Sequence, residues 1–362
     1  MVPPAKATAA SALSAPQQGE QRTTATDTQR IESLAQAVTS PDPATQRRAL
    51  AKAITLLEST RPDHREHADA LLTELLPQAG HSFRLGISGV PGVGKSTFIE
   101  ALGLYLIEQG HRVAVLTIDP SSSVSGGSIL GDKTRMEKLS VHPQAYIRPS
   151  PSSGTLGGVA EKTREAMLVC EAAGYDIVIV ETVGVGQSEL AVTGMTDMLV
   201  LMQLPNAGDD LQAIKKGVME LADLVVINKA DLDADAATRA EAQISSALHL
   251  LGSHAPADAT HLPAAWRPDV IQISALQGQG ITVFWERVTQ FRSQQHAAGL
   301  FADRRRRQAL DWMWERIDHD LKLAFRQHPR VQALLPTLTA DVTAGRVPAS
   351  TAARCLLSAL KN

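Results

Sequence analysis

Between residues 31 and 80, apolar residues recur at helical spacing, which predicts three amphipathic helices. Asp42 and Pro43 are typical of an N-cap followed by the first residue of a helix, because proline lacks the N–H that a helix start leaves unpaired. The apolar positions are Ile31, Leu34, Ala35, Val38, Leu50, Ala53, Ile54, Leu57, Ala68, Leu71, Leu72 and Leu75. We expect this N-terminal helical segment to serve packing and to hold no site.

From Phe83 the pattern changes to short, nearly continuous apolar runs separated by helical patterns. Such runs are typical of strands that are buried on both faces, and their alternation with helices predicts a mostly parallel sheet with right-handed crossovers. The runs are Phe83–Ser88, Val113–Ile118, Ile177–Val180, Met198–Met202, Leu224–Ile227 and Val270–Ile273. Residues 81–295 are therefore predicted to form a doubly wound α/β domain.

Beyond about Gln295 the strand pattern ends, and residues 296–362 are predicted to be helical. One long helix is indicated by the apolar positions Leu310, Met313, Trp314, Ile317, Leu321 and Ala324, and shorter ones are indicated near Val331 and after Ser350. A stripe this hydrophobic, with Trp312 beside it, is expected to pack on the α/β domain or on a second subunit. We favour a homodimer.

The composition adds little to the pattern but excludes some classes of protein. Of the 362 residues 44% are hydrophobic and 20% charged, with 35 Lys and Arg against 38 Asp and Glu, as in an ordinary globular protein. This balance argues against a nucleic-acid partner bound through a dominant basic charge. Residues 304–307 are all arginine, and we interpret this run as a solvated face or an interface in preference to a nucleic-acid patch.

Cysteine spacing and the N-terminal residues indicate the cellular compartment of the protein. Cys170 and Cys355 have neither disulfide-framework nor zinc-ribbon spacing, which fits a reducing cytoplasm. No run approaches the roughly 18 apolar residues of a membrane span, so no membrane partner is expected. Residues 1–30 lack the apolar core of a secretory signal, and Glu20 and Asp27 argue against a transit peptide; we expect a disordered tail.

The first motif with chemistry lies between the strand ending at Ser88 and the next helical pattern. It is Gly89, Val90, Pro91, Gly92, Val93, Gly94, Lys95 and Ser96, followed by Thr97, and it fits G-x-x-x-x-G-K-[ST]. Glycines let the backbone wrap a diphosphate with its N–H groups pointing inward, and the helix N-terminus adds positive potential. Lys95 is expected to reach the β and γ phosphates and Ser96 to ligate Mg²⁺.

A second motif follows the strand Leu224–Ile227 and indicates which base is bound. Asn228, Lys229 and Asp231 have the spacing N-K-x-D, in which Asp231 can accept from the guanine N1–H and exocyclic amine, a pair that adenine lacks. The lysine stem packs on the base, and Asn228 ties this loop to the phosphate loop. A backbone N–H from the later turn Ser274, Ala275 and Leu276 can meet the guanine O6. Together the motifs favour GTP over ATP.

Carboxylates that hold Mg²⁺ and orient the attacking water complete such a site. Asp119 ends the strand Val113–Ile118 and begins a Ser/Gly-rich loop that also contains Asp132. A long loop of this kind suits a segment that is ordered by nucleotide and released after hydrolysis. The alternative, a merely flexible connector, leaves unexplained an aspartate at the carboxyl end of a strand, where such sheets bind ligands.

The place of the usual D-x-x-G switch is taken by Glu181 and Gly184, with glutamate for aspartate. The carboxylate would lie near Mg²⁺, and the Gly184 N–H would sense the γ-phosphate. The residue that positions water is left open, because Gln187 lies three residues beyond Gly184. Arg135 could contact phosphates or pair with a carboxylate of its own loop.

These residues resemble one family closely, the G-protein chaperones of adenosylcobalamin-dependent acyl-CoA mutases of the MeaB/MMAA/ArgK type. The resemblance extends from about Ile31 to the C-terminus. It rests on G-V-P-G-V-G-K-S-T at Gly89, D-P-S-S at Asp119, G-G-S-I-L-G-D-K-T-R-M at Gly126, E-T-V-G-V-G-Q-S-E at Glu181, and N-K-A-D at Asn228. The long motif at Gly126 is the specific part, because generic GTPases do not carry it.

The resemblance implies a P-loop NTPase fold of the SIMIBI class, slow GTP hydrolysis that the mutase accelerates, and a homodimer held by C-terminal helices. It implies nucleotide and magnesium roles for Lys95, Asp119, Asp132 and Glu181. Residues 204–216 look like the family's third switch, which responds to the mutase, although Asn206 stands where relatives often have glycine. The partner mutase itself is not indicated by any residue.

Two rival functions stay in view. A metallochaperone GTPase would need a metal store, and only His64 and His67 come near one, at i,i+3 on an otherwise ordinary helix. A kinase linked to amino-acid transport would need an acceptor pocket, and it would not need to select guanine. A scaffold with an inactive phosphate loop is disfavoured, because Lys95, Ser96 and the acidic residues are all present.

Overall fold

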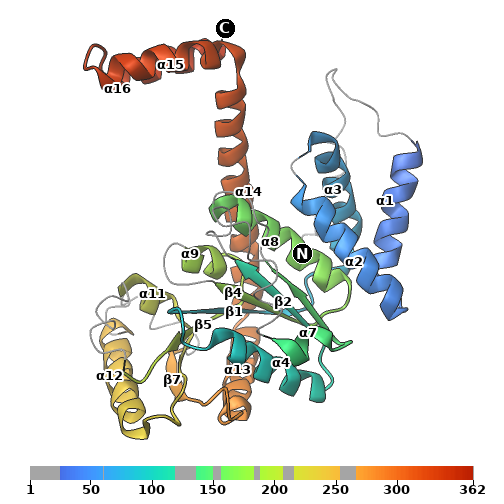
Figure 1. Ribbon diagram of the computed structural model, residues 1–362, viewed down its shortest axis with the longest axis vertical. Coiled ribbons are helices and arrows are strands. Elements are labelled where there is room, and N and C mark those ends of the chain that lie inside the picture. Colours follow the sequence, from blue (N-terminus) through green and yellow to red (C-terminus); the bar gives the residue numbers. More distant parts are fainter. Residues whose placement is uncertain are drawn as a thin grey trace, which may run out of the picture.

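The molecule combines a seven-stranded sheet, three N-terminal helices and a C-terminal helical arm (Figure 1). The computed structural model describes residues 25–59, 61–118, 136–149, 156–182, 188–206, 216–252 and 266–361. The expected disordered tail, the loop from Asp119 to Arg135, Gly184, Gln187 and most of the third-switch segment therefore lie wholly or largely outside the described residues. In the described part, no helix is long and apolar enough to cross a membrane.

All strand pairs in the sheet are parallel, and the strand order is β3-β2-β4-β1-β5-β6-β7. The strands are β1 (Phe83–Gly89), β2 (Val113–Ile118), β3 (Ala145–Arg148), β4 (Ile177–Thr182), β5 (Met198–Gln203), β6 (Leu224–Ile227) and β7 (Asp269–Gln272). The predicted α/β class and P-loop fold are confirmed. The sequence pattern does not indicate β3, because its residues, Ala-Tyr-Ile-Arg, do not form a continuous run of Val, Ile and Leu.

Helices cover both faces of the sheet (Figure 1). They are α4 (Lys95–Glu108), α7 (Glu137–Val141), α8 (Leu156–Ala172), α9 (Ser188–Thr193), α11 (Lys216–Leu221), α12 (Ala234–Gly252) and α13 (Ile281–Ala297). On one face α4, α7 and α13 pack around Phe83, Leu85 and Ile87 of β1. On the other, α8 packs on β2 and β4, the N-terminal helices pack on α8, and α12 covers β5 to β7. The central strands are therefore shielded on both sides, as their continuous apolar runs require.

The N-terminal helices are α1 (Ala25–Val38), α2 (Pro43–Glu58) and α3 (Pro62–Leu75), and a short 3₁₀ turn, Leu76–Gln78, follows them. The Asp42 side chain caps α2 by accepting from the Thr45 N–H at 2.9 Å, as the Asp-Pro pair predicts. Helix α1 begins at Ala25, so the predicted tail boundary at residue 30 is wrong by six residues. Asp27 in the first turn favours that earlier start, because a carboxylate there interacts with the helix dipole.

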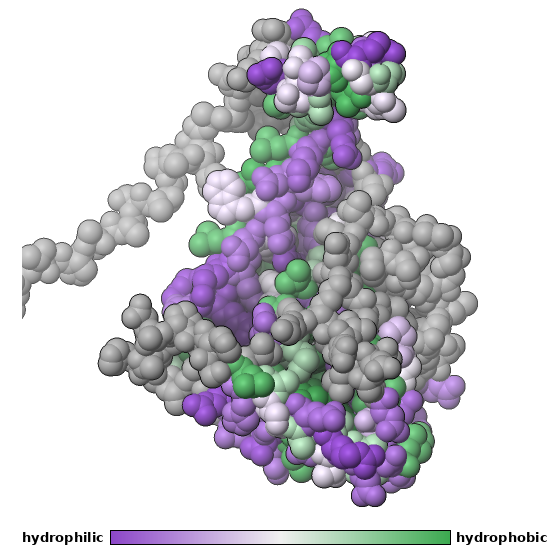
Figure 2. Space-filling view, turned by 90° about the vertical axis from the view of Figure 1, so that its left-hand side faces the viewer, coloured by the Kyte–Doolittle hydropathy of each residue, from purple (hydrophilic) through white to green (hydrophobic). Residues whose placement is uncertain are grey.

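The C-terminal arm consists of α14 (Leu300–Gln327), α15 (Pro329–Thr343) and α16 (Ala349–Lys361). Helix α14 projects beyond the sheet and carries α15 and α16 at its far end (Figure 1). The apolar stripe of α14 does not pack on the α/β domain: Leu310 is 56% exposed, Trp314 61% and Leu321 63%. Hydrophobic patches lie among hydrophilic ones along the arm (Figure 2). Of the two predicted partners for the stripe, the α/β domain is therefore wrong, and the homodimer stays a prediction.

The root of the arm is anchored by arginine. Arg305 forms bonds of 2.7 and 2.6 Å to the two carboxylate oxygens of Asp197, which is 1% exposed and lies just before β5. Arg304 reaches Asp223, just before β6, at 3.4 Å. Both predicted alternatives for the arginine run, a solvated face and an interface, occur: Arg306 and Arg307 are exposed, whereas Arg304 and Arg305 lie at the contact between the arm and the α/β domain.

A second buried ion pair lies at the same end of the sheet. Arg84 of β1 binds both carboxylate oxygens of Glu171 in α8, at 2.7 and 2.8 Å. Burial alone would raise the pKa of Glu171, but the hydrogen bonds and charge of Arg84, with hydrogen bonds from Ser82 and the Gly80 N–H, outweigh it and lower the pKa. This pair therefore fastens α8 to the central strand opposite the phosphate loop.

Candidate functional site

The phosphate loop joins the end of β1 to the start of α4 through three glycines whose backbone requires them. Gly92 and Gly94 have φ of +79° and +95°, in the left-handed region that side chains disfavour. A Cβ on Gly94 would lie 2.6 Å from the Asn228 amide nitrogen, and one on Gly89 would lie 2.6 Å from the Met202 carbonyl oxygen. The turn that the motif predicts is thus fixed by close approach as well as by backbone angle.

Lys95 begins α4 and is only 8% exposed. Its ammonium donates to the carbonyl oxygens of Gly89, at 2.7 Å, and Val90, at 3.3 Å. The cation therefore lies across the mouth of the phosphate loop, where its charge can meet an anion. Val93 is fully buried, so its side chain belongs to the core and only its backbone faces the loop. Pro91 is exposed, and Thr97 continues the first turn of α4.

Two of the four predicted magnesium ligands meet beside this loop. The Ser96 hydroxyl is 3.3 Å from Oε1 of Glu181, a buried residue near the end of β4. Asp119 and Asp132 are outside the described residues, but Ile118 pairs with Thr182, so the chain leaves β2 directly beside Glu181. A hydroxyl and a carboxylate oxygen are hard donors of the kind that Mg²⁺ prefers.

Asn228 connects three segments. It follows β6, is 2% exposed, and donates through Nδ2 to the Val93 carbonyl at 2.8 Å. Its Oδ1 accepts from the Ala275 N–H, which follows β7, at 3.0 Å. Lys229 adopts φ of +62° and its ammonium donates to the Gly92 carbonyl at 2.9 Å. The N-K-x-D loop, the phosphate loop and the turn after β7 therefore form one bonded unit.

Asp231 lies at the exposed rim of this unit, where its Oδ2 accepts from the Gln277 side-chain amide at 3.2 Å. Gln277 is not among the predicted residues, although it directly follows the turn Ser274, Ala275 and Leu276. The Ala275 N–H already donates to Asn228, and Ser274 and Gln279 close the turn by bonds of 3.1 and 3.0 Å. Leu276, 84% exposed, is then the better candidate in this turn for a donor to a base.

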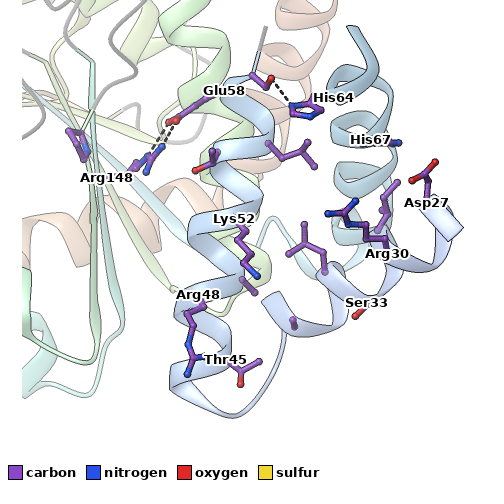
Figure 3. Close-up of a pocket in the computed structure, with 18 residues that line it drawn as sticks. Asp27, Arg30, Ser33, Thr45, Arg48, Lys52, Glu58, His64, His67 and Arg148 are labelled. Carbon is purple, nitrogen blue, oxygen red and sulfur yellow. Dashed lines mark hydrogen bonds and ion pairs between the residues drawn. The ribbon is translucent and has the colours of Figure 1, made fainter. Parts of the chain in front are cut away.

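A hollow of the described structure lies elsewhere, between α1, α2, α3 and the end of β3 (Figure 3). It measures about 1030 Å³, and Arg30, Arg48 and Lys52 line it. His64 also lines it, with Nδ1 2.8 Å from the Ser59 hydroxyl. His67 comes from the same helix, and no group of three or more His, Cys, Asp or Glu suited to a metal occurs among the residues that the structure describes.

Comparisons with known proteins agree with this geometry. A solved structure described as a LAO/AO transport system kinase superposes with a TM-score of 0.70 at 34% identity, covering 94% of this chain and 99% of that one. A putative GTPase of Caulobacter vibrioides is 54% identical over 313 residues, 86% of this chain and 94% of the relative. The mitochondrial methylmalonic aciduria type A homolog of Mus musculus is 48% identical over 328 residues, 88% of this chain and 77% of the relative.

A family model gives the assignment. The model described as "Methylmalonyl Co-A mutase-associated GTPase MeaB" matches residues 50–330, a range that includes the phosphate loop, the N-K-x-D loop and the root of the arm. The expected family is confirmed, and with it the predicted P-loop NTPase fold. The chain belongs to the MeaB family of methylmalonyl-CoA mutase-associated GTPases.

Proposed function

We propose that the chain hydrolyses GTP to GDP and phosphate and acts as a chaperone of an adenosylcobalamin-dependent acyl-CoA mutase. The observation that carries the nucleotide part is the Asn228 side chain, which bonds both to the phosphate loop and to the turn after β7. Recognition of phosphates and of the base is thereby built on one rigid unit. Family membership carries the mutase part.

Guanine is selected, in this proposal, by Asp231. Its carboxylate already accepts from the amide of Gln277, and an amide N–H₂ is the same kind of donor as the exocyclic amine of guanine. Adenine offers an acceptor at N1 and would leave the carboxylate facing a lone pair. The Lys229 stem lies between this carboxylate and the phosphate loop, where it can cover the base.

The phosphates are held, in this proposal, by the backbone N–H groups of residues 89–97 and by Lys95. Ser96, Glu181, Asp119 and Asp132 would hold Mg²⁺, which when bound would neutralise charge on the phosphates. The Glu181 side chain fixes the Ser96 hydroxyl at 3.3 Å, and Lys95 supplies positive charge at the mouth of the loop. Gly184 would sense the γ-phosphate.

The partner part of the proposal follows the family. GTP binding would close the segments that begin at Asp119 and Glu181, and residues 205–216 would pass the nucleotide state to the mutase, gating adenosylcobalamin loading or the removal of damaged cofactor. The exposed stripe of α14 supports a homodimer held by the arm. The cytoplasm is the proposed compartment, and Cys170 and Cys355 are both free thiols.

A nucleotide panel tests the base assignment. Asp231→Asn should exchange the acceptor for a donor and shift hydrolysis from GTP toward XTP, by about 10- to 100-fold in the ratio of kcat/KM, because a good bidentate contact contributes about 1–3 kcal/mol of base discrimination. Asp233→Asn, two residues on and capping α12 through a 2.9 Å bond to the Ala236 N–H, is the matched control. An unchanged GTP to XTP ratio in Asp231→Asn contradicts the assignment.

The same panel tests the kinase alternative, which the name of one solved relative suggests. GTP turnover measured with and without amino-acid acceptors should be equal, and no phosphorylated amino acid should form. Candidate mutases are then added. Co-elution with one of them, together with faster GTP turnover, supports the chaperone proposal; if none of them binds in any nucleotide state, that proposal fails while the GTPase assignment stands.

A further inference from the structure

Helix α9, Ser188–Thr193, stands between the nucleotide site and the C-terminal arm. In its first turn Glu189 is completely buried, with Oε1 3.5 Å from the Ser88 hydroxyl. Ser88 directly precedes the phosphate loop and also accepts a 3.0 Å hydrogen bond from the hydroxyl of Thr182, the last residue of β4. One end of α9 is therefore in contact with the strand ends that carry Gly89 and Glu181.

The other end of α9 is held by the arm. Gln308 of α14 donates through Nε2 to two carbonyl oxygens, those of Thr193 at 2.9 Å and Thr196 at 2.8 Å. Arg164 of α8 adds a weaker contact, 3.5 Å from the Gly194 carbonyl, and forms an ion pair with Glu315, further along α14. The turn that ends α9 is thus bonded to the arm at its root and braced from α8.

The Gln308 amide can adopt only one orientation. Both of its acceptors are carbonyls, so turning the amide over would set Oε1 against two oxygen atoms. Within the described part of the chain Oε1 is buried and accepts no hydrogen bond. The polar contacts of this side chain are therefore its two donor bonds, which join α14 to the Thr193 and Thr196 carbonyls.

We propose that Gln308 is a positioning residue for GTP hydrolysis, which acts through α9 and the contact of Glu189 with Ser88, the residue that precedes the phosphate loop. This inference rests on the proposed GTPase function. Helix α9 packs on the sheet through the fully buried side chain of Val192, and the contacts at its two ends join this packed helix to Ser88 and to the arm. Because coupling between two binding equilibria is reciprocal, an arm that is moved by a partner would change the nucleotide site, and nucleotide would change the arm.

Two substitutions test the inference. Gln308→Met keeps the volume of the side chain but removes both donors, and Gln308→Glu sets a carboxylate against the same two carbonyls. Arg307→Met is the matched control, one residue away and exposed. The measurements are the single-turnover rate of GTP hydrolysis, the Kd for GDP and for GTP, and the melting temperature of each nucleotide-free protein.

Both Gln308 variants should hydrolyse GTP about 30-fold more slowly, the factor that corresponds to losing two neutral hydrogen bonds, while Kd changes by less than about twofold. Arg307→Met should match the wild type. Wild-type hydrolysis by a folded Gln308→Met protein overturns the inference, and so does a loss of rate and of affinity by the same factor, which indicates a structural role. Failure of the proposed function is distinct, because it shows as absent turnover in the wild type.

Discussion

The substitution Gly94→Ala probes the unit that joins the phosphate loop to the N-K-x-D loop. Gly94 has φ of +95°, and an alanine there costs about 1–2 kcal/mol in backbone energy. Its Cβ would also lie 2.6 Å from Nδ2 of Asn228, which is buried and donates to the Val93 carbonyl at 2.8 Å. The new methyl group must displace the Asn228 amide, because Asn228 is only 2% exposed and its side chain cannot move into solvent.

Displacing the amide leaves a buried carbonyl without its donor, at a cost of about 1–3 kcal/mol. The total loss for Gly94→Ala is then about 2–5 kcal/mol. Gly92→Ala is the control, because Gly92 has φ of +79° but no atom lies within 4 Å of the place that a methyl group would take, so only the backbone cost of about 1–2 kcal/mol remains. The reduced entropy of the unfolded chain is the same for both variants and cancels.

The assay is urea unfolding of the two nucleotide-free variants, followed by far-UV circular dichroism. We expect Gly94→Ala to be less stable than Gly92→Ala by about 1–3 kcal/mol, the part that belongs to the displaced amide. In titration calorimetry, Gly94→Ala should likewise bind GDP more weakly than Gly92→Ala does. Equal stability of the two variants would refute the reasoning, since it would mean that the Asn228 contact contributes nothing.

The anchors of the arm, the buried ion pair and the exposed stripe can each be tested by a single substitution. Arg305→Met leaves the buried Asp197 carboxylate without its cation and should lower the free energy of unfolding by about 3–5 kcal/mol, whereas Arg306→Met, whose partner Asp303 is exposed, should cost less than about 1 kcal/mol in the same urea titration. The pKa of Glu171 is lowered from 4.5, so its charge stabilises the fold above that pH, and the stabilisation is lost as the pH falls through the folded-state pKa. The difference in free energy of unfolding between wild type and Glu171→Gln, measured at a series of pH values, should therefore become smaller in that window. A difference that does not change with pH would count against the ion pair. Leu321→Glu on the exposed stripe should convert a dimer into a monomer in sedimentation velocity, while Lys322→Glu beside it should not; a monomeric wild type would rule out the proposed homodimer.

The strands and the phosphate loop are predictable from sequence because their signals are local. A buried parallel strand must be apolar along its whole length, and the loop needs glycine where φ is positive, so six of the strands and the turn at Gly92 and Gly94 can be located from the residues alone. The edge strand Ala145–Arg148 gives no such signal, because a tyrosine and an arginine interrupt its apolar residues.

The contacts that join distant segments are harder to predict from the sequence. The motif N-K-x-D indicates that Asn228 faces the phosphate loop, but nothing in the spacing shows that it also takes up the Ala275 N–H. No sequence pattern marks Gln277 or Gln308, because the role of each depends on which carboxylate or carbonyl the fold places opposite it. Arg304 and Arg305 are of the same kind, since only the folded chain sets them against Asp223 and Asp197.

The central claim is that one bonded unit recognises both the phosphates and the base of a guanine nucleotide. Titration calorimetry of the wild-type protein with GDP and with ADP, each in the presence of Mg²⁺, tests it most directly. We predict binding of one GDP per chain and an affinity for ADP about 10- to 100-fold weaker, the range that a good bidentate base contact provides. Equal affinities, or no heat with GDP, would contradict it.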